Sequence, residues 1–99
     1  MRVSLSVRSV VAVVKDQVSC DLGGEAAILS LNNGVYYGLD AVGARIWTLL
    51  HKPISVSEIR DTLLNEYEVE PGRCESDLLA LLKNLAAQAL IEIKDESTS

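Results

Sequence analysis

Short stretches of alternating apolar and polar residues fill the first half of the chain, and this two-residue period is typical of β-strands. Two turn signals, Gly23-Gly24 and Asn32-Asn33-Gly34, interrupt the pattern, since Gly and Asn tolerate the left-handed backbone region. The pattern predicts an antiparallel meander of three strands joined by two hairpins. An apolar run before it forms either a further strand or a buried arm. In chain order these segments are Val10–Val14, Val18–Leu22, Glu25–Leu31 and Val35–Leu39.

The second half of the chain repeats its apolar residues at helical spacing. Asp40 suits the N-cap of a first helix, because its carboxylate accepts the free backbone N–H groups of the next turn. This helix is expected to end at Lys52-Pro53, since the residue before proline avoids the helical region. Its predicted core face carries Val42, Ile46, Leu49 and Leu50, with Trp47 beside them.

Two further helices and a short strand follow. Ser55 and Glu58 fit a capping box at the start of the second helix, and Pro71 suits the first turn of the third. The helices have the outline of a winged helix-turn-helix, so the expected fold class is α+β. The third helix is expected to run to about Ala89 and to bury Leu78, Leu82, Leu85 and Ala89. A strand at Leu90–Ile93 and a flexible polar tail at Asp95–Ser99 complete the chain.

The 99 residues suit a single domain, and their composition limits what it does. A hydrophobic content of 48% disfavours disorder, and no apolar run is long enough to span a bilayer. A net charge of -5 disfavours binding to nucleic acid, which needs clustered cations. No signal peptide is visible, and the widely spaced Cys20 and Cys74 are expected to be reduced. These features predict a cytoplasmic protein.

Residues that carry catalysis or hold metal ions are scarce. The single histidine, His51, follows a predicted helix end, where it is expected to interact with the last carbonyl groups. One histidine and two distant cysteines do not make a zinc site, and no Cys–His motif or glycine-rich phosphate loop is present. The acidic residues Glu66 and Glu68 are expected to be solvated. The sequence therefore predicts a non-catalytic protein without metal or cofactor.

An ordered set of motifs resembles the PqqD-like proteins, named for pyrroloquinoline quinone biosynthesis. It begins with the run from Gly34 to Trp47, GVYYGLDAVGARIW. The SVSEI and EYEV segments of the second helix and the leucine-rich third helix with its Leu90-Ile91 exit follow in the same order. The resemblance covers residues 17–93. No single segment is specific, whereas their order is.

The resemblance implies both a fold and a function. The fold is a three-stranded antiparallel β-meander packed on a winged helix-turn-helix-like three-helix unit, one domain over residues 1–99 with its core at about 17–93. The function is to bind the leader segment of a ribosomally synthesised, post-translationally modified peptide. The leader adds as an extra strand and is presented to a separate leader protease, or to a radical-SAM or cyclase enzyme. Among such subunits, the YYGLD turn followed by ARIW most resembles the lasso-peptide type.

The sequence also meets the physical requirements of strand addition. An edge strand offers unpaired backbone groups to another chain, and the last meander strand lacks the Lys and Pro that usually block such pairing. The third helix carries apolar residues beyond one core stripe, as a second wall requires. The predicted peptide-binding residues are Val35, Tyr36, Tyr37, Gly38 and Leu39 on the strand, and Arg73, Cys74, Asp77, Leu78 and Leu81 on the helix.

Several alternatives stay open at this stage. One of Tyr36 and Tyr37 is expected in the core and the other in the groove or on the surface, and Leu81 suits the core equally well. Asp77 suits a role at the helix dipole at least as well as a ligand contact. For the whole protein, the alternatives are a winged-helix DNA-binding regulator, a structural subunit that assembles enzymes, and a PqqD-like chaperone of a quinone-cofactor or radical-SAM pathway. The few basic residues of the third helix argue against DNA binding.

Overall fold

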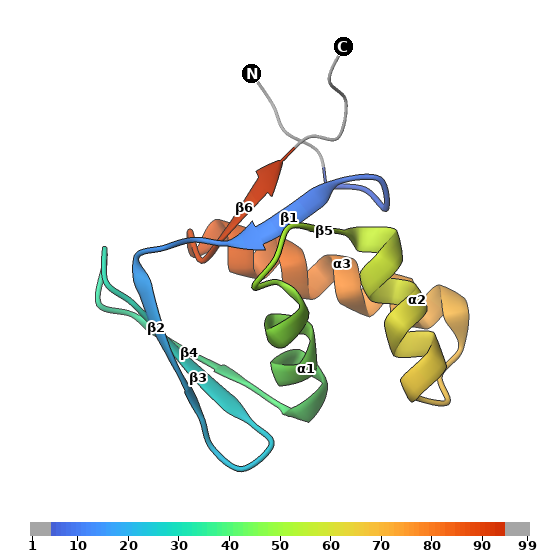
Figure 1. The fold of residues 1–99 in the computed structure, drawn as a ribbon, viewed down its shortest axis with the longest axis horizontal. Coiled ribbons are helices and arrows are strands. Elements are labelled where there is room, and N and C mark those ends of the chain that lie inside the picture. Colours follow the sequence, from blue (N-terminus) through green and yellow to red (C-terminus); the bar gives the residue numbers. More distant parts are fainter. Residues whose placement is uncertain (1–4, 95–99) are drawn as a thin grey trace.

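The computed structural model describes residues 5–94, which form two small antiparallel sheets and three helices (Figure 1). One sheet has the strand order β2-β3-β4 and the other β5-β1-β6. The strands are β1 (Val10–Val13), β2 (Gln17–Asp21), β3 (Ala26–Ser30), β4 (Tyr36–Leu39), β5 (Ile54–Ser55) and β6 (Ile91–Lys94). The helices are α1 (Ala41–Leu49), α2 (Val56–Glu66) and α3 (Pro71–Ala87).

The β2-β3-β4 sheet is the predicted meander, and its two hairpins turn at the predicted glycines. Gly23, Gly24 and Gly34 all have positive φ angles, of 73°, 98° and 70°, which explains why glycine suits both turns. Among the described residues, β4 pairs only with β3 and therefore lies at an edge of the sheet. The expectation that the last meander strand keeps one free side is confirmed.

Local capping signals determine where the helices begin. The Asp40 carboxylate accepts the N–H of Gly43 at 2.8 Å and caps α1, as predicted. Ser55 and Glu58 form the expected capping box of α2. α3 has its proline in the first turn, while its N-cap is Glu70, whose carboxylate accepts the N–H of Arg73 at 2.7 Å.

The second sheet was only partly foreseen, because it joins segments that are distant in sequence. The apolar run at the start of the described chain is its central strand, β1, paired with both β5 and β6. Val11 is fully buried there and joins Ile91 in the core. The sheet closes the helical unit on one side (Figure 1), which completes the winged-helix outline. The predicted tail at 95–99 lies outside the described residues.

Two helix expectations are wrong. Ala89 does not belong to the core stripe of α3, because the helix ends at Ala87 and Ala89 is exposed with a φ of 59°. Val42 does not face the core, since it is 40% exposed, and Gly43 takes the buried position instead. Trp47 is buried as expected, at 3% exposure.

Candidate functional site

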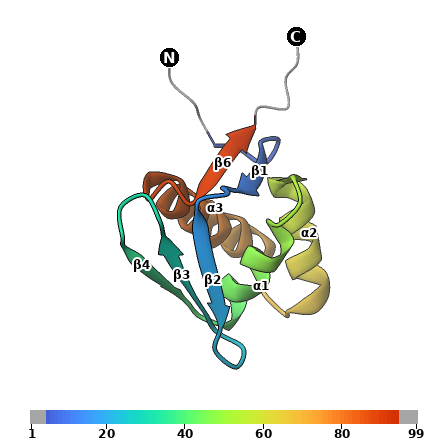
Figure 2. The same cartoon turned by 60° about the vertical axis from the view of Figure 1, so that its left-hand side comes forward.

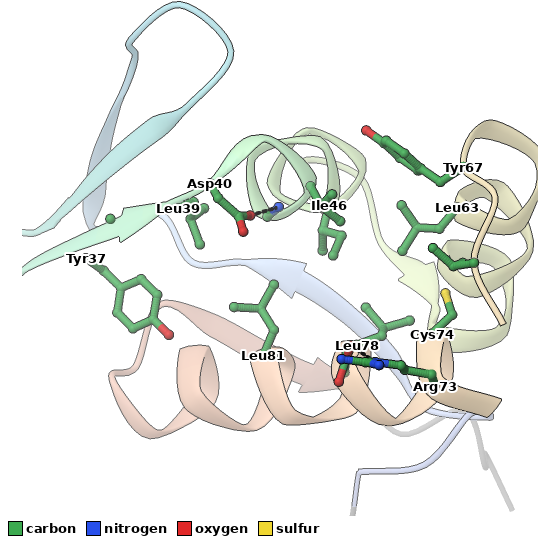
Figure 3. Close-up of a pocket in the computed structure, with 15 residues that line it drawn as sticks. Tyr37, Leu39, Asp40, Ile46, Leu63, Tyr67, Arg73, Cys74, Leu78 and Leu81 are labelled. Atoms are coloured by element: carbon green, nitrogen blue, oxygen red, sulfur yellow. Dashed lines mark hydrogen bonds and ion pairs between the residues drawn. The ribbon is translucent and has the colours of Figure 1, made fainter. Parts of the chain in front are cut away.

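A cavity of about 640 Å³ lies between the edge strand β4, helix α3, and the ends of α1 and α2 (Figure 3). Its lining is mostly apolar, and its three charged residues are Asp40, Arg73 and Asp77. Eight of the ten residues predicted from the sequence line this cavity. They are Tyr37, Gly38, Leu39, Arg73, Cys74, Asp77, Leu78 and Leu81.

The hydrogen bonds of the meander determine which backbone groups of β4 are free. The Ser30 N–H donates to the Val35 carbonyl oxygen at 3.0 Å, so these two residues form a hydrogen-bonded pair. Along an antiparallel ladder, hydrogen-bonded pairs alternate with pairs that are not hydrogen-bonded. With Ile28 opposite Tyr37 and Ala26 opposite Leu39, the bonded residues of β4 are therefore Tyr37 and Leu39. The N–H and C=O groups of Tyr36 and Gly38 point to the open edge. This edge runs along the cavity, which Gly38 itself lines.

The side chains of β4 alternate between two surroundings. Leu39 is buried, and Tyr37 packs partly against the core while lining the cavity, where its ring points toward α3 (Figure 3). Tyr36 is 72% exposed and points to the other side of the sheet. One of the two tyrosines was expected in the core. Tyr37 meets this expectation only in part, because it packs against the core but is not fully buried.

The remaining predicted strand residue, Val35, lies just before β4 in the hairpin. Its N–H donates to the side-chain oxygen of Asn33 at 3.1 Å and so is not free for a partner chain. Val35 is 44% exposed and does not line the cavity.

Helix α3 supplies the opposite wall. Cys74 and Leu78 are buried at its floor, whereas Leu81 is half-buried and points from α3 toward α1 (Figure 3). Leu81 both packs against the core and lines the cavity, which resolves the alternative left open by its helical position. Apolar surface thus remains accessible on α3 beyond its core stripe.

The charged residues at the cavity have separate roles. Arg73 and Asp77 form an i,i+4 ion pair at 3.7 Å with side chains 81% and 74% exposed, so both are accessible to a ligand. Asp77 lies beyond the first turn of α3, which therefore offers it no dipole role. Asp40 is committed to capping α1. A ligand in the cavity therefore meets one exposed cation and one exposed anion on α3.

Burial raises the pKa of the Cys74 thiol, and the nearby Asp77 carboxylate raises it further. The thiol is accordingly neutral at physiological pH, which suits an apolar wall and not a nucleophile.

The sequence missed the part of the cavity that α1, α2 and the α2–α3 loop contribute. Val42 and Val69 are exposed apolar residues there, and Tyr67 is half-buried at the end of α2. The sequence signal for this part of the cavity is that Val42 and Val69 are apolar although they lie next to polar helix ends, where solvated residues are usual. The missed lining residues are Asp40, Val42, Gly43, Ile46, Leu63, Tyr67 and Val69.

Other candidate chemistry is accounted for by structural contacts. The Nδ1 atom of His51 lies 2.9 Å from the Trp47 carbonyl oxygen, as expected at a helix end. Glu66 is not simply solvated, because it forms a bidentate pair with Arg45 of α1, with a shortest distance of 2.6 Å. Within residues 5–94, no group of three metal-binding side chains is present. None of the helices in this part of the chain is long and apolar enough to cross a membrane.

Comparison with known proteins agrees with this geometry. The family model of coenzyme PQQ synthesis protein D (PqqD) matches residues 25–91. The structure of TbiB1 in complex with the TbiA(beta) leader peptide is similar, with a TM-score of 0.77 and 40% identity over 82% of this chain and 94% of TbiB1. No curated protein sequence matches the chain.

A second solved structure has the same fold at lower identity. It is the solution NMR structure of the PqqD truncation of Methylobacterium extorquens PqqCD, described as a stand-alone recognition element for ribosomally synthesized and post-translationally modified peptides. Its TM-score is 0.74 at 21% identity, over 90% of this chain and 95% of that chain.

Proposed function

The chain belongs to the PqqD family, and on this premise we propose that it is a non-catalytic domain that binds the leader segment of a ribosomally synthesised precursor peptide. The observation that carries the proposal is the open edge of β4 beside an apolar cavity walled by α3. A relative that is 40% identical, TbiB1, has been solved with a leader peptide, which supports the same ligand class here.

The proposed binding mode is strand addition. The outward N–H and C=O groups of Tyr36 and Gly38 pair with an extended peptide, which becomes a fourth strand of the meander. Because successive side chains of a strand point to opposite faces, every second peptide side chain enters the cavity. An aliphatic or aromatic side chain buried there contributes roughly 1.5–3 kcal/mol before ordering costs are subtracted.

The peptide then passes between two walls. Leu78 and Leu81 contact its inward side chains from α3, and Tyr37 does so from β4. Near the start of α3, Arg73 and Asp77 pair with polar or charged groups of the peptide, because both side chains are exposed. In this binding mode, the backbone hydrogen bonds to β4 provide affinity for the peptide, and the cavity provides selectivity for its side chains.

Within this function, we place the chain in a lasso-peptide pathway in the cytoplasm, where it delivers the leader to a separate leader protease. The YYGLD and ARIW segments support the lasso assignment. A radical-SAM or cyclase enzyme is the alternative partner.

Amide hydrogen exchange tests the binding mode directly. We expect the leader of the precursor encoded beside this chain's gene to protect the amides of Tyr36 and Gly38. The amides of Tyr37 and Leu39, already bonded to β3, should change little. Protection confined to β2, or absent at both outward amides, would contradict strand addition at β4.

A further inference from the structure

The β2-β3-β4 sheet has a second face, which the peptide site does not use. Ile28 and Leu39 point inward and are buried at 0% and 6% exposure. The residues that alternate with them along each strand, such as Leu29 and Gly38, point away from the helices. Figure 2 turns this outer face toward the viewer, and no helix covers it there.

Within the described part of the chain, the strand residues of this outer face include no charged or strongly polar side chain. The pairing register aligns Val18 of β2, Leu29 of β3 and Tyr36 of β4 in one row across the sheet. Cys20, Ala27 and Gly38 form a second row beside it. Val18 is 54% exposed and Tyr36 is 72% exposed. A solvated sheet face normally carries polar residues at these positions, so this one is built to be covered.

The other exposed apolar residues support this assignment. Of the large hydrophobic residues that are exposed within residues 5–94, Val42 and Val69 line the peptide cavity. The others belong to the meander, either on its outer face or at its hairpin ends: Val18, Leu22, Leu31, Val35 and Tyr36. The exposed apolar surface therefore forms two areas, one on each side of β4.

We propose that the outer face docks the enzyme that acts on the bound peptide, through an apolar patch flanked by Lys or Arg side chains on that enzyme. The proposal rests on the proposed function. Strand β4 connects the two surfaces, because Tyr37 and Leu39 face the peptide cavity while Tyr36 faces outward. An enzyme on the outer face thus lies beside the peptide strand without occupying its cavity.

Charge and area favour an enzyme over a second copy of this chain. One acidic residue flanks the face at each hairpin end, Asp16 and Glu25, and Lys15 is the cation beside them. Asp21 points to the opposite face, since it lies in one row with Ala26 and Leu39. Two chains of net charge -5 repel each other, whereas a basic rim on a partner is attracted. Two five-residue strands and one four-residue strand cover roughly 220 Å² in outline, far below the ~800 Å² that each partner buries in a stable complex. A small face of this kind suits transient docking.

The test uses Val18→Asp, which places a charge on the outer face at the strand farthest from the peptide cavity. Ser19→Asp is the matched control, because this exposed neighbour on β2 points to the opposite face. Val18→Thr, which keeps the β-branched shape, reports on the face if the aspartate variant does not fold. The probe is the purified protease or modifying enzyme encoded beside this chain's gene, titrated without peptide. The leader is titrated onto each variant separately.

We expect Val18→Asp to weaken enzyme binding at least tenfold and Val18→Thr to weaken it several-fold. Ser19→Asp should change enzyme binding less than twofold. All three variants should bind the leader with wild-type affinity. Unchanged enzyme binding by Val18→Asp, equal losses in both aspartate variants, or no binding by the wild type would overturn the proposal. A wild-type dimer in sedimentation that Val18→Asp dissociates would assign the face to a second copy. Failure of the proposed function is distinguishable, since it appears as loss of leader binding by the wild type.

Discussion

The backbone N–H of Leu90 donates to the carbonyl oxygen of Leu85 at 2.9 Å, and this bond closes the last turn of α3. Together with the bond from the Ala89 N–H to the Ala86 oxygen at 3.0 Å, it forms a Schellman motif. The motif requires a left-handed residue, which here is Ala89 with a φ of 59°. Leu90 is thereby turned into the core, at 1% exposure, before β6 begins.

The substitution Ala89→Gly is predicted to stabilise the fold. A left-handed alanine costs about 1–2 kcal/mol, whereas glycine adopts this region freely and loses part of the gain through its greater unfolded-state entropy. We expect a net gain of about 0.5–1 kcal/mol in the free energy of unfolding, measured by urea denaturation. Ala87→Gly is the control and should destabilise by a similar amount, since Ala87 lies in the helix. A loss of stability in Ala89→Gly would contradict the motif.

The ion pair between α1 and α2 predicts a pH dependence. Hydrogen bonding to Arg45 lowers the pKa of Glu66. A lowered folded-state pKa contributes stability above the unfolded-state value of about 4.3, and the contribution is lost as the pH falls through the folded-state pKa. Wild type should therefore exceed Glu66→Gln in urea midpoint at neutral pH, with the difference closing in acid. Glu68→Gln is the control, as Glu68 is exposed and makes no ion pair within the described residues. A difference that grows toward low pH would rule out this pairing.

The two cysteines should react at different rates. Cys20 is exposed and Cys74 is buried, with a thiol pKa that burial raises. A disulfide reagent at neutral pH is expected to modify one thiol quickly and the second at least tenfold more slowly. Cys20→Ser should remove the fast phase, and bound leader should slow the remaining phase because Cys74 lines the cavity. A fast phase that persists in Cys20→Ser would show that Cys74 is accessible.

The cavity wall on α3 predicts a loss of binding in Leu81→Asp. A carboxylate at this half-buried position loses hydration when a peptide side chain covers it, so leader affinity should fall at least tenfold. Ala80→Asp is the matched control, since Ala80 is an exposed neighbour on the same helix that does not line the cavity. Fluorescence anisotropy with labelled leader measures both. Equal affinities of the two variants would remove Leu81 from the site.

Local signals explain which parts of this structure were predictable. The meander turns at glycines with positive φ, and the Asp40 cap and the Ser55–Glu58 box each depend on residues within three positions. The predicted helix starts and edge strand therefore agree with the structure. The end of α3 was placed wrongly, because the left-handed residue that ends the helix is Ala89. Glycine usually occupies this position and marks the end of a helix in the sequence.

Long-range packing accounts for what the sequence did not reveal. β5 is only two residues long and forms through pairing with β1, some 40 positions away, so no local pattern marks it. The rotation of α1 about its axis placed Gly43 inward and Val42 outward, which helical spacing alone does not decide. Tyr67 and Val69 reach the cavity only because α2 and α3 pack together. The strand and α3 walls of the cavity were thus predictable, and its α1–α2 end was not.

The most direct measurement is the leader affinity of Gly38→Pro, which removes an outward N–H of β4 and leaves the bonds to β3 in place. A side chain at Gly38 meets open space, so Gly38→Ala separates the effect of the lost N–H from that of added atoms. Ser19→Pro removes an outward N–H from the opposite edge, β2, as the matched control. We expect Gly38→Pro to bind leader at least tenfold more weakly, while Gly38→Ala and Ser19→Pro stay within threefold of wild type. Wild-type affinity in folded Gly38→Pro would show that the peptide does not add to β4.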